Sequence, residues 1–423
     1  MQLQPPSSIG WLFLDLNSYF ATVEQQLSPA LRGKPVAVVP LETDATCAIA
    51  ASYEAKAFGI KTGTPVYEAK KLCPELICVL ADHEKYVDFH HQIIAEVDRH
   101  IPVSDIASID EMACELDVSQ RKPQVAIALA KQIKKGLHQN VGEVINCSIG
   151  LAPNRFLSKI ATNLQKPNGL VVIEPKDIPY KLLNLNFDDI PGLGRAMQHR
   201  LAQVGVHSMA QLYQLDAKEM RAIWHNVEGE RMFYKLRGIE IAKEQTQKRV
   251  VGHSHVLAPE NRPENEAKRV SQRLLLKAAS RMRRLEYYAT YLTVGLRIEN
   301  GRKYHADASF KVACDNQSLA KIWQELWTSI IQHSGQKNPL IKKISVNLHG
   351  LVHASQVQPD LFDDPTVSQS QQKNEKLSHA MDALNSRFGR NTVTTAATIG
   401  EANSQTGTKI AFSRIPDKEE FVE

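Results

Sequence analysis

The chain has 423 residues, 43% of them hydrophobic and 23% charged, with a formal net charge of +5. One hydrophobic core seldom organises so long a chain, so two to four domains are expected. The sequence shows no apolar run of about 20 residues and no signal-peptide pattern, which excludes a membrane-spanning or secreted class and predicts a cytoplasmic protein. The mild positive charge permits a polyanionic partner without requiring one.

The N-terminal part alternates strand and helix patterns. The run WLFLDLNSYF begins as a central strand that Asp15 interrupts, and ATVEQQL continues it as a helix. KPVAVVP predicts a second strand, and SYEAKAFGIKTGTPVYEAKKLCP predicts short helices broken by Gly and Pro.

An acidic pair, Asp110 and Glu111, stands inside SDIASIDEMACELD, a stretch that otherwise resembles a half-buried strand. A helix near 122–139, the strand VINCSIGLA and the helix NRFLSKIATNLQ follow, and this last helix stops at KPNG. The mixed order predicts an α+β domain with a mostly antiparallel sheet.

From about residue 180 to 240 the pattern is helical, and EQTQKRVVGHS is a predicted linker. A second α+β unit begins at VGHSHVLAP. Its long helix carries seven Lys or Arg from Lys268 to Arg284, and three alternating strands predict a sheet with helices on one side and a free polar face on the other. After about residue 353 the sequence loses its periodicity, which predicts disorder apart from a short helix near 375–387.

The acids at positions 15, 110 and 111 lie in two predicted strands that an antiparallel sheet can bring together. Adjacent carboxylates repel each other, and a divalent cation supplies the missing positive charge. Oxygen-rich sites suit Mg²⁺, and two ions about 3.5–4 Å apart assist in-line phosphoryl transfer. The alternative is that each acid is an ordinary strand-end residue.

Two lysines stand where a triphosphate could use them. Lys56 lies one helical turn after Tyr53, and Lys166 lies beside a turn. A solvated surface charge is the alternative for each lysine. The sequence IPGLG at residues 190–194 fits either the hairpin of a helix-hairpin-helix, which binds DNA phosphate through backbone N–H groups, or a plain connection.

Five segments occur together in the order and spacing of one family: LDLNSYFATVE, SYEAKAFGIKTGTP, SIDEMACELD, CSIGLAPNRFLSKIATNLQKPNG and IPGLGR. From about residue 10 to 350 the chain resembles the Y-family of translesion DNA polymerases. The resemblance implies an α+β multidomain, right-hand polymerase. Its parts would be a palm at 1–178 with small fingers at about 27–79, a helix-hairpin-helix thumb at 179–242, a linker and α+β little-finger domain at 243–352, and a largely disordered tail at 353–423.

The resemblance also implies roles for individual residues. Asp15, Asp110 and Glu111 would bind two Mg²⁺ ions, with the Leu16 carbonyl as a further ligand, and Phe20 would be the steric gate that excludes a ribonucleotide 2′-hydroxyl. The other implied contacts are with the nucleotide (Tyr19, Tyr53, Lys56 and Lys166) and with DNA (Gly192, Gly194, Thr293 and Arg297).

Three positions depart from the usual pattern of the family. Asn17 stands where many members have a second Asp, and we interpret it as supporting rather than metal-binding. Lys56 replaces a more frequent Arg, which trades a bidentate fork for a point charge. Ala50 replaces a common Thr or Ser and removes one hydroxyl donor near the triphosphate.

QPDLF at residues 358–362 resembles the bacterial peptide that binds the sliding clamp, with Gln358, Leu361 and Phe362 as its contacts. We therefore expect a monomeric, low-fidelity lesion-bypass polymerase of the SOS response to DNA damage. It would act on primer-template DNA with deoxynucleoside triphosphates, without proofreading. The alternatives are a catalytically inactive scaffold that recruits another polymerase to the clamp, and a helix-hairpin-helix nuclease.

Overall fold

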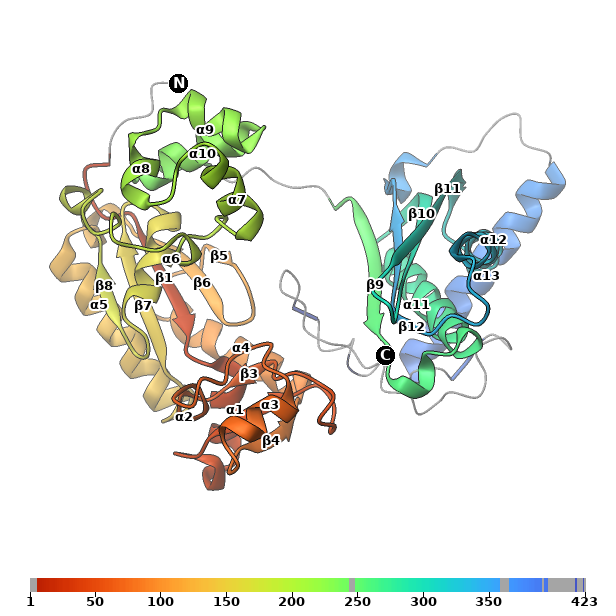
Figure 1. Ribbon diagram of the computed structural model, residues 1–423, viewed down its shortest axis with the longest axis horizontal. Helices are drawn as coiled ribbons and strands as arrows, with labels where there is room; N and C mark the ends of the chain where they lie inside the picture. The colour runs from red at the N-terminus through yellow and green to blue at the C-terminus, as the bar shows by residue number, and fades with distance from the viewer. Residues whose placement is uncertain are drawn as a thin grey trace. The chain divides into compact units, whose positions relative to one another are not determined.

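The computed structural model describes residues 6–242, 248–357, 365–389 and 392–394, together with 415, 416 and 421. The chain divides into two compact units with a boundary between Lys243 and Glu244 (Figure 1). Each unit combines sheets and helices, which confirms the predicted α+β multidomain class. No helix in these described ranges is long and apolar enough to cross a membrane.

The first unit contains a five-stranded sheet in the order β5-β6-β1-β7-β8. Its strands are β1 (Trp11–Leu16), β5 (Asp105–Ile106), β6 (Glu111–Glu115), β7 (Cys147–Ala152) and β8 (Leu170–Val172). All neighbouring pairs are antiparallel except β7 with β8. The central strand β1 is buried from its second residue to its last, as its apolar run predicts.

Helices cover both faces of this sheet. Leu12 and Leu14 share a core with α4 (His83–Asp98) and α5 (Pro123–Gly136), beside α1 (Tyr19–Leu27). The intervening Phe13 points to the opposite face, where α6 (Arg155–Leu164) packs and Lys159 Nζ lies 5.6 Å from the centre of the Phe13 ring. Because side chains alternate along a strand, Asp15 lies on the α6 face as well.

Gly150 of β7 allows α6 to approach the sheet closely. A Cβ at this position would lie 2.1 Å from the Ser158 carbonyl oxygen and 2.8 Å from the Thr162 nitrogen. Any larger residue would force α6 away from the strand. This close packing brings α6, and the turn that follows it, over the row of residues that contains Asp15.

A smaller three-stranded sheet precedes α4. Its order is β3-β2-β4, with β2 (Val36–Val39), β3 (Ala50–Ala51) and β4 (Ile77–Leu80), and it carries η1 (Pro29–Leu31), α2 (Tyr53–Lys56) and α3 (Val66–Leu72). These elements have a separate small core that includes Ile60 and Cys73. They fall within the span predicted for the fingers, a name that remains a prediction.

Short helices complete the first unit. After η2 (Val118–Gln120) and the π-helical turn η3 (Leu137–Val141) come η4 (Pro175–Asp177), η5 (Phe187–Asp189), α7 (Arg195–Gln203), α8 (Met209–Gln214), α9 (Ala217–Trp224) and α10 (Val227–Leu236). The helices α7 to α10 share one core with Leu157 and Ile160 of α6. Asn154 also donates hydrogen bonds to the carbonyls of Lys235 and Ile239, which ties the start of α6 to the end of this helical region.

The second unit is an antiparallel sheet in the order β11-β10-β12-β9, with β13 paired to β10. Its elements are β9 (Val250–Val256), η6 (Pro259–Asn261), α11 (Glu264–Arg284), β10 (Tyr287–Ile298), β11 (Lys303–Ala313), α12 (Asn316–Ser334), β12 (Ile341–His349), β13 (Val352–His353) and η7 (Ala354–Gln356). Leu292, Val294 and Leu296 pack against α11 and α12, as their alternation predicts. The strand β9 includes residues 250–254, the end of the predicted linker, and begins one residue before the predicted start of the second unit at Val251.

The tail contains more helix than the sequence predicts. α13 (Pro365–Phe388) begins ten residues before the predicted short helix and packs on the second unit. Arg283 donates to Asp382 through Nε (2.7 Å) and Nη2 (3.0 Å), and the Asn316 N–H donates to the Ser378 hydroxyl (3.0 Å). The prediction of disorder is therefore wrong for 365–374, whereas the helix predicted near 375–387 is present, and polar contacts rather than an apolar stripe dock it. Arg283 is correspondingly a buried partner and not part of a solvated basic face.

Candidate active site

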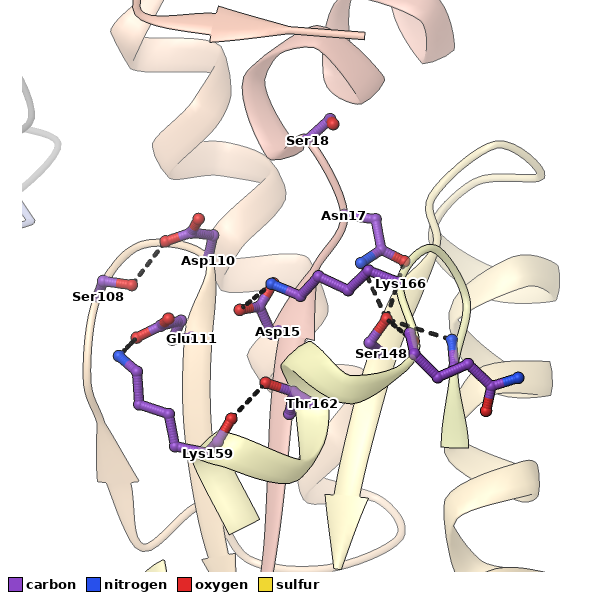
Figure 2. A network of polar contacts seen from close by, with 12 residues as sticks. Asp15, Asn17, Ser18, Ser108, Asp110, Glu111, Ser148, Lys159, Thr162 and Lys166 are labelled. Carbon is purple, nitrogen blue, oxygen red and sulfur yellow. Dashed lines mark hydrogen bonds and ion pairs between the residues drawn. The ribbon is translucent and has the colours of Figure 1, made fainter. Parts of the chain in front are cut away.

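Three acidic side chains lie at one end of the central sheet (Figure 2). Asp15 of β1 stands directly opposite Glu111 of β6 in the antiparallel register, so the two share a sheet face. Asp110 lies at the start of β6, and its carbonyl accepts a hydrogen bond from the Leu16 N–H at 2.9 Å. The sheet register thus brings together the acids that the sequence places in two separate strands.

Two lysines from the α6 region neutralise this acidic row. Lys166 Nζ lies 2.7 Å from Asp15 Oδ2, and Lys159 Nζ lies 2.5 Å from Glu111 Oε2. Asp110 is held differently, since its Oδ1 accepts a hydrogen bond from the Ser108 hydroxyl at 2.6 Å. Both lysines are long and about a third exposed, so they can move aside for another cation.

The electrostatics of the row favour a bound cation. Burial, with added repulsion from Glu111 and Asp110, raises the pKa of Asp15 to about 6 although Lys166 opposes the shift. Burial and the charge of Glu111 also raise the pKa of Asp110, against a hydrogen bond from Ser108. Carboxylates crowded in this way hold protons for lack of positive charge, and hard oxygen donors suit Mg²⁺.

Among the described residues, no group of three His, Cys, Asp or Glu side chains lies close enough together to hold one ion. The donor chemistry still fits a divalent cation, because three buried carboxylates with mutual repulsion meet at one strand end. Binding would require Lys166 and Lys159 to release Asp15 and Glu111. The three acidic residues therefore fit a divalent cation by residue type and electrostatics, and the two lysine side chains would have to rearrange for it to bind.

The raised pKa of Asp15 predicts a pH dependence of cation binding. Only the ionised carboxylate binds metal, so affinity is complete well above pH 6 and falls as the pH drops through about 6, by about tenfold per unit. Calcium should therefore raise the melting temperature more at pH 7.5 than at pH 5.5. A thermal-shift titration with calcium checks this, with Asp15→Asn as the variant expected to lose the response. An equal calcium response at both pH values would contradict it.

Two side chains of α2, beside the small sheet, lie near the acidic row. Lys56 Nζ of α2 donates to the Ser18 hydroxyl at 2.7 Å and lies 4.4 Å from the centre of the Tyr53 ring. Burial lowers the pKa of Lys56, with further repulsion from Lys166, while Asp15 opposes the shift. Lys56 and Tyr53 thus lie within electrostatic range of Lys166 and Asp15, as a shared anion site requires.

The two aromatic residues that open α1 have different surroundings. Phe20 stacks on Tyr86, with ring centres 4.3 Å apart and planes 13° apart, and meets His83 edge-on at 6.0 Å. Tyr19 is 4% exposed and its hydroxyl donates to the Tyr86 carbonyl at 2.6 Å. Because the Tyr19 ring belongs to the core, a nucleotide contact by this residue would have to use its backbone, and that contact stays a prediction.

The Asn17 side chain bonds β7 and the turn after α6, which fits a supporting role; that it does not bind metal stays a prediction. Its Oδ1 accepts from the Asn168 N–H at 2.7 Å and its Nδ2 donates to the Ser148 hydroxyl at 3.1 Å. Figure 2 shows Asn17 beside Ser148, and the Asn17 side chain bonds Ser148 rather than Asp15 or Asp110. Ala50 lies in β3, nearly buried.

The remaining predicted contacts lie elsewhere in the chain. Gly192 has φ +91°, and Gly194 immediately precedes α7, so this turn exposes backbone N–H groups at a helix start. In the second unit, Thr293 Oγ1 lies 2.8 Å from His349 Nε2, and Arg297 is exposed near the end of β10. The clamp-binding residues Gln358, Leu361 and Phe362 lie outside the described residues.

Sequence reasoning missed four residues that complete the site: Ser18, Ser108, Ser148 and Lys159. The serines carry no signal because serine is common in turns and strand ends. Lys159 carries a weak signal in the sequence, since it stands seven residues, or about two helical turns, before Lys166 in the same motif. Only the register of β1, β6 and β7 places these side chains next to the acids.

Comparison with known proteins identifies the relatives of this chain. Sequence models of the impB/mucB/samB family match residues 14–163 and those of its C-terminal domain match residues 248–361. DNA polymerase IV 1 of Bacillus subtilis (strain 168) is 28% identical over 400 residues, covering 93% of this chain and 94% of the relative. DNA polymerase IV of Xanthomonas oryzae pv. oryzae (strain MAFF 311018) is 36% identical over 229 residues, covering 54% and 62%.

Solved structures show the same fold. A Y-family DNA polymerase chimera of Dbh and Dpo4 superposes with a TM-score of 0.69 at 25% identity, covering 81% of this chain and 99% of that chain. An insertion ternary complex of Dbh DNA polymerase gives a TM-score of 0.52 at 25% identity, with the same coverage. The predicted right-hand polymerase fold is thereby confirmed. The chain belongs to the impB/mucB/samB family, within the Y-family of DNA polymerases.

Proposed function

We propose that the protein is a template-directed lesion-bypass DNA polymerase that adds deoxynucleotides to a primer 3′ end with two Mg²⁺ ions. The observation that carries this proposal is the meeting of Asp15, Asp110 and Glu111 with Lys56 and Lys166 at one end of the sheet. Acidic side chains alone fit many kinds of metal site. Acidic side chains beside two long lysine side chains fit a metal-bound triphosphate, because the lysines can contact its phosphates.

The site residues divide into three roles. Asp15, Asp110 and Glu111, with the Leu16 carbonyl, would hold the cations. Bound Mg²⁺ would activate the primer hydroxyl and neutralise charge on the phosphates. Lys56, Lys166 and Tyr53 bind and orient the triphosphate, and Phe20 closes the space beside the sugar. Low fidelity and the absence of proofreading belong to this proposal as well.

The domain names follow from the same proposal. The palm with fingers spans 1–178, the thumb 179–242, the linker and little-finger domain 243–352, and the tail 353–423. In the thumb, backbone N–H groups near Gly192 and Gly194 would contact a DNA phosphate without reading sequence. The protein would act as a monomer in the cytoplasm during the response to DNA damage.

The free face of the second unit has the chemistry of a DNA-backbone surface. Most residues at its centre are small or neutral, where Gly295 pairs with Ser345 and Thr293 pairs with Asn347, although the acidic Asp307 of β11 also stands opposite Thr293. At one end Arg297 stands between Lys303 of β11 and Lys343 of β12, and all three are exposed. The small side chains allow close approach, and the cations attract phosphate.

We expect Arg297→Ala to weaken DNA binding at every sequence. Loss of one phosphate contact should reduce the slope of log affinity against log salt by about 1. Fluorescence anisotropy over a range of salt concentrations measures this slope. Lys321→Ala is the matched control, since Lys321 is exposed on α12, which covers the other face of the sheet. Equal effects of the two substitutions would argue against this DNA face.

The segment QPDLF would tether the enzyme to the sliding clamp through Gln358, Leu361 and Phe362. Replacing Leu361 and Phe362 by Ala should reduce clamp affinity at least about tenfold, because two apolar anchors are lost. Surface plasmon resonance with purified clamp measures it, and extension of a primer without clamp should be unchanged. Undiminished clamp affinity would remove this peptide from the proposal.

Primer extension with purified protein, Mg²⁺ and deoxynucleotides tests the function directly. Growth of the primer by template-directed steps supports the polymerase. Shortening of the DNA would instead support a nuclease. Clamp binding without extension would support a catalytically inactive scaffold.

A further inference from the structure

The turn at residues 165–169 carries Lys166 from the end of α6 to Asp15, and its shape is held by residues that none of the assigned roles includes. Asn168 adopts φ +54°, a left-handed conformation that Asn tolerates better than most residues other than Gly. A Cβ at Gly169 would lie 1.7 Å from the Gln165 carbonyl oxygen, so the turn closes tightly on itself.

Two side chains hold its backbone N–H groups. Asn17 Oδ1 accepts from the Asn168 N–H at 2.7 Å, and Ser148 Oγ accepts from the Gly169 N–H at 3.2 Å. Ser148 also donates to the Gln165 carbonyl at 3.3 Å and accepts from Asn17 Nδ2 at 3.1 Å. Asn17 and Ser148 are 3% and 0% exposed, so each of these bonds has at least one buried partner (Figure 2).

Lys134 of α5 holds the carbonyl groups of the same turn. Its Nζ donates to the Asn168 carbonyl at 2.6 Å and to the Gly169 carbonyl at 2.9 Å. The turn is thereby bonded through both its N–H groups and its carbonyls. An amide at position 17 suits this arrangement because it accepts from one partner and donates to another, which a carboxylate cannot do.

We propose that Asn17, Ser148 and Lys134 form a clamp that fixes the turn at 165–169 and so sets the position of Lys166 at the phosphate site. These are positioning residues: none needs to touch the nucleotide, and each acts through Lys166. The consequence for catalysis rests on the proposed polymerase function. The effect on the turn itself does not.

The first test reads the turn directly. Asn17→Ala and Lys134→Met should speed amide hydrogen exchange at Asn168 and Gly169 by about tenfold, the effect of losing one buried hydrogen bond. Asn17→Asp keeps the acceptor and should retain protection of the Asn168 amide. The matched controls are Asn146→Ala, whose side chain donates to the Val144 carbonyl, and Lys135→Met, an exposed lysine beside Lys134. Unchanged exchange in both clamp variants would overturn the proposal.

The second test reads the action through Lys166. Asn17→Ala and Lys134→Met should raise the KM for nucleotide about tenfold with kcat changed much less, because a misplaced lysine weakens phosphate binding. In a Lys166→Met background neither should raise KM further. Independent, multiplicative effects would overturn the proposal. If the wild-type protein extends no primer, the polymerase function fails, and the exchange experiment alone still decides whether the clamp exists.

Discussion

Replacing Asp110 and Glu111 together by alanine should abolish primer extension, with a loss of about four orders of magnitude or more in the single-turnover rate. These two acids supply most of the negative charge that a cation would meet at the start of β6, and Asp15 alone cannot hold two ions. Their polar contacts are with Ser108 and Lys159, at the edge of the sheet and outside its apolar core. The fold should therefore survive the double substitution.

The measurement pairs quenched-flow extension with DNA binding by fluorescence anisotropy. DNA affinity should stay within about threefold of the wild type, since acids at a metal site do not attract a polyanion. Glu115→Ala is the matched control, because Glu115 lies on the same strand and is exposed. Retained extension in the double variant would remove both acids from catalysis, whereas lost DNA binding would point to a disturbed fold.

Replacing Phe20 by alanine should admit ribonucleotides, with discrimination against them falling on the order of a hundredfold. The ring is held on two sides, stacked on Tyr86 and edge-on to His83, so it cannot swing away from a 2′-hydroxyl without losing these contacts. Its removal leaves space that the extra hydroxyl can occupy. Incorporation of deoxynucleotides should fall much less, because a sugar without a 2′-hydroxyl does not occupy that space.

The ratio of kcat/KM for a deoxynucleotide and its ribonucleotide measures this discrimination. Phe388→Ala serves as a control for loss of a phenylalanine, since Phe388 is exposed on α13 of the second unit. Unchanged discrimination in Phe20→Ala would assign the selection against ribonucleotides to another residue. A fall equal to that of the control would do the same.

Much of the fold follows from hydrophobic pattern. The apolar run before Asp15 predicts β1, and the alternation around Leu292 and Val294 predicts a strand with one buried face, because burial of each alternate side chain is a local property. Hydrophobic pattern does not predict the first part of α13, before residue 375. α13 docks through Arg283, Asp382 and Ser378, and polar contacts of this kind leave no periodic apolar signal.

The candidate site divides in the same way. Asp15, Asp110 and Glu111 are visible in the sequence because acids inside strand patterns are costly and therefore stand out. The residue order does not show that the Tyr19 ring turns into the core while the Phe20 ring stacks on Tyr86. Successive helical residues point about 100° apart, and which of the two rings is buried depends on where α4 packs against α1.

Residue type and order along the chain determined which chemistry this protein can perform: a set of oxygen ligands, two cationic arms and an aromatic ring, in strands and helices of recognisable period. Tertiary structure alone decided that Asp15 faces Glu111, that Gly150 lets α6 bring Lys159 and Lys166 over them, and that Asn17, Ser148 and Lys134 hold the turn. The physical reason is that register and helix approach arise from packing between separate segments, some of them far apart in the chain, as are Asn17 and Ser148, which are 131 positions apart. No local pattern encodes such a distance.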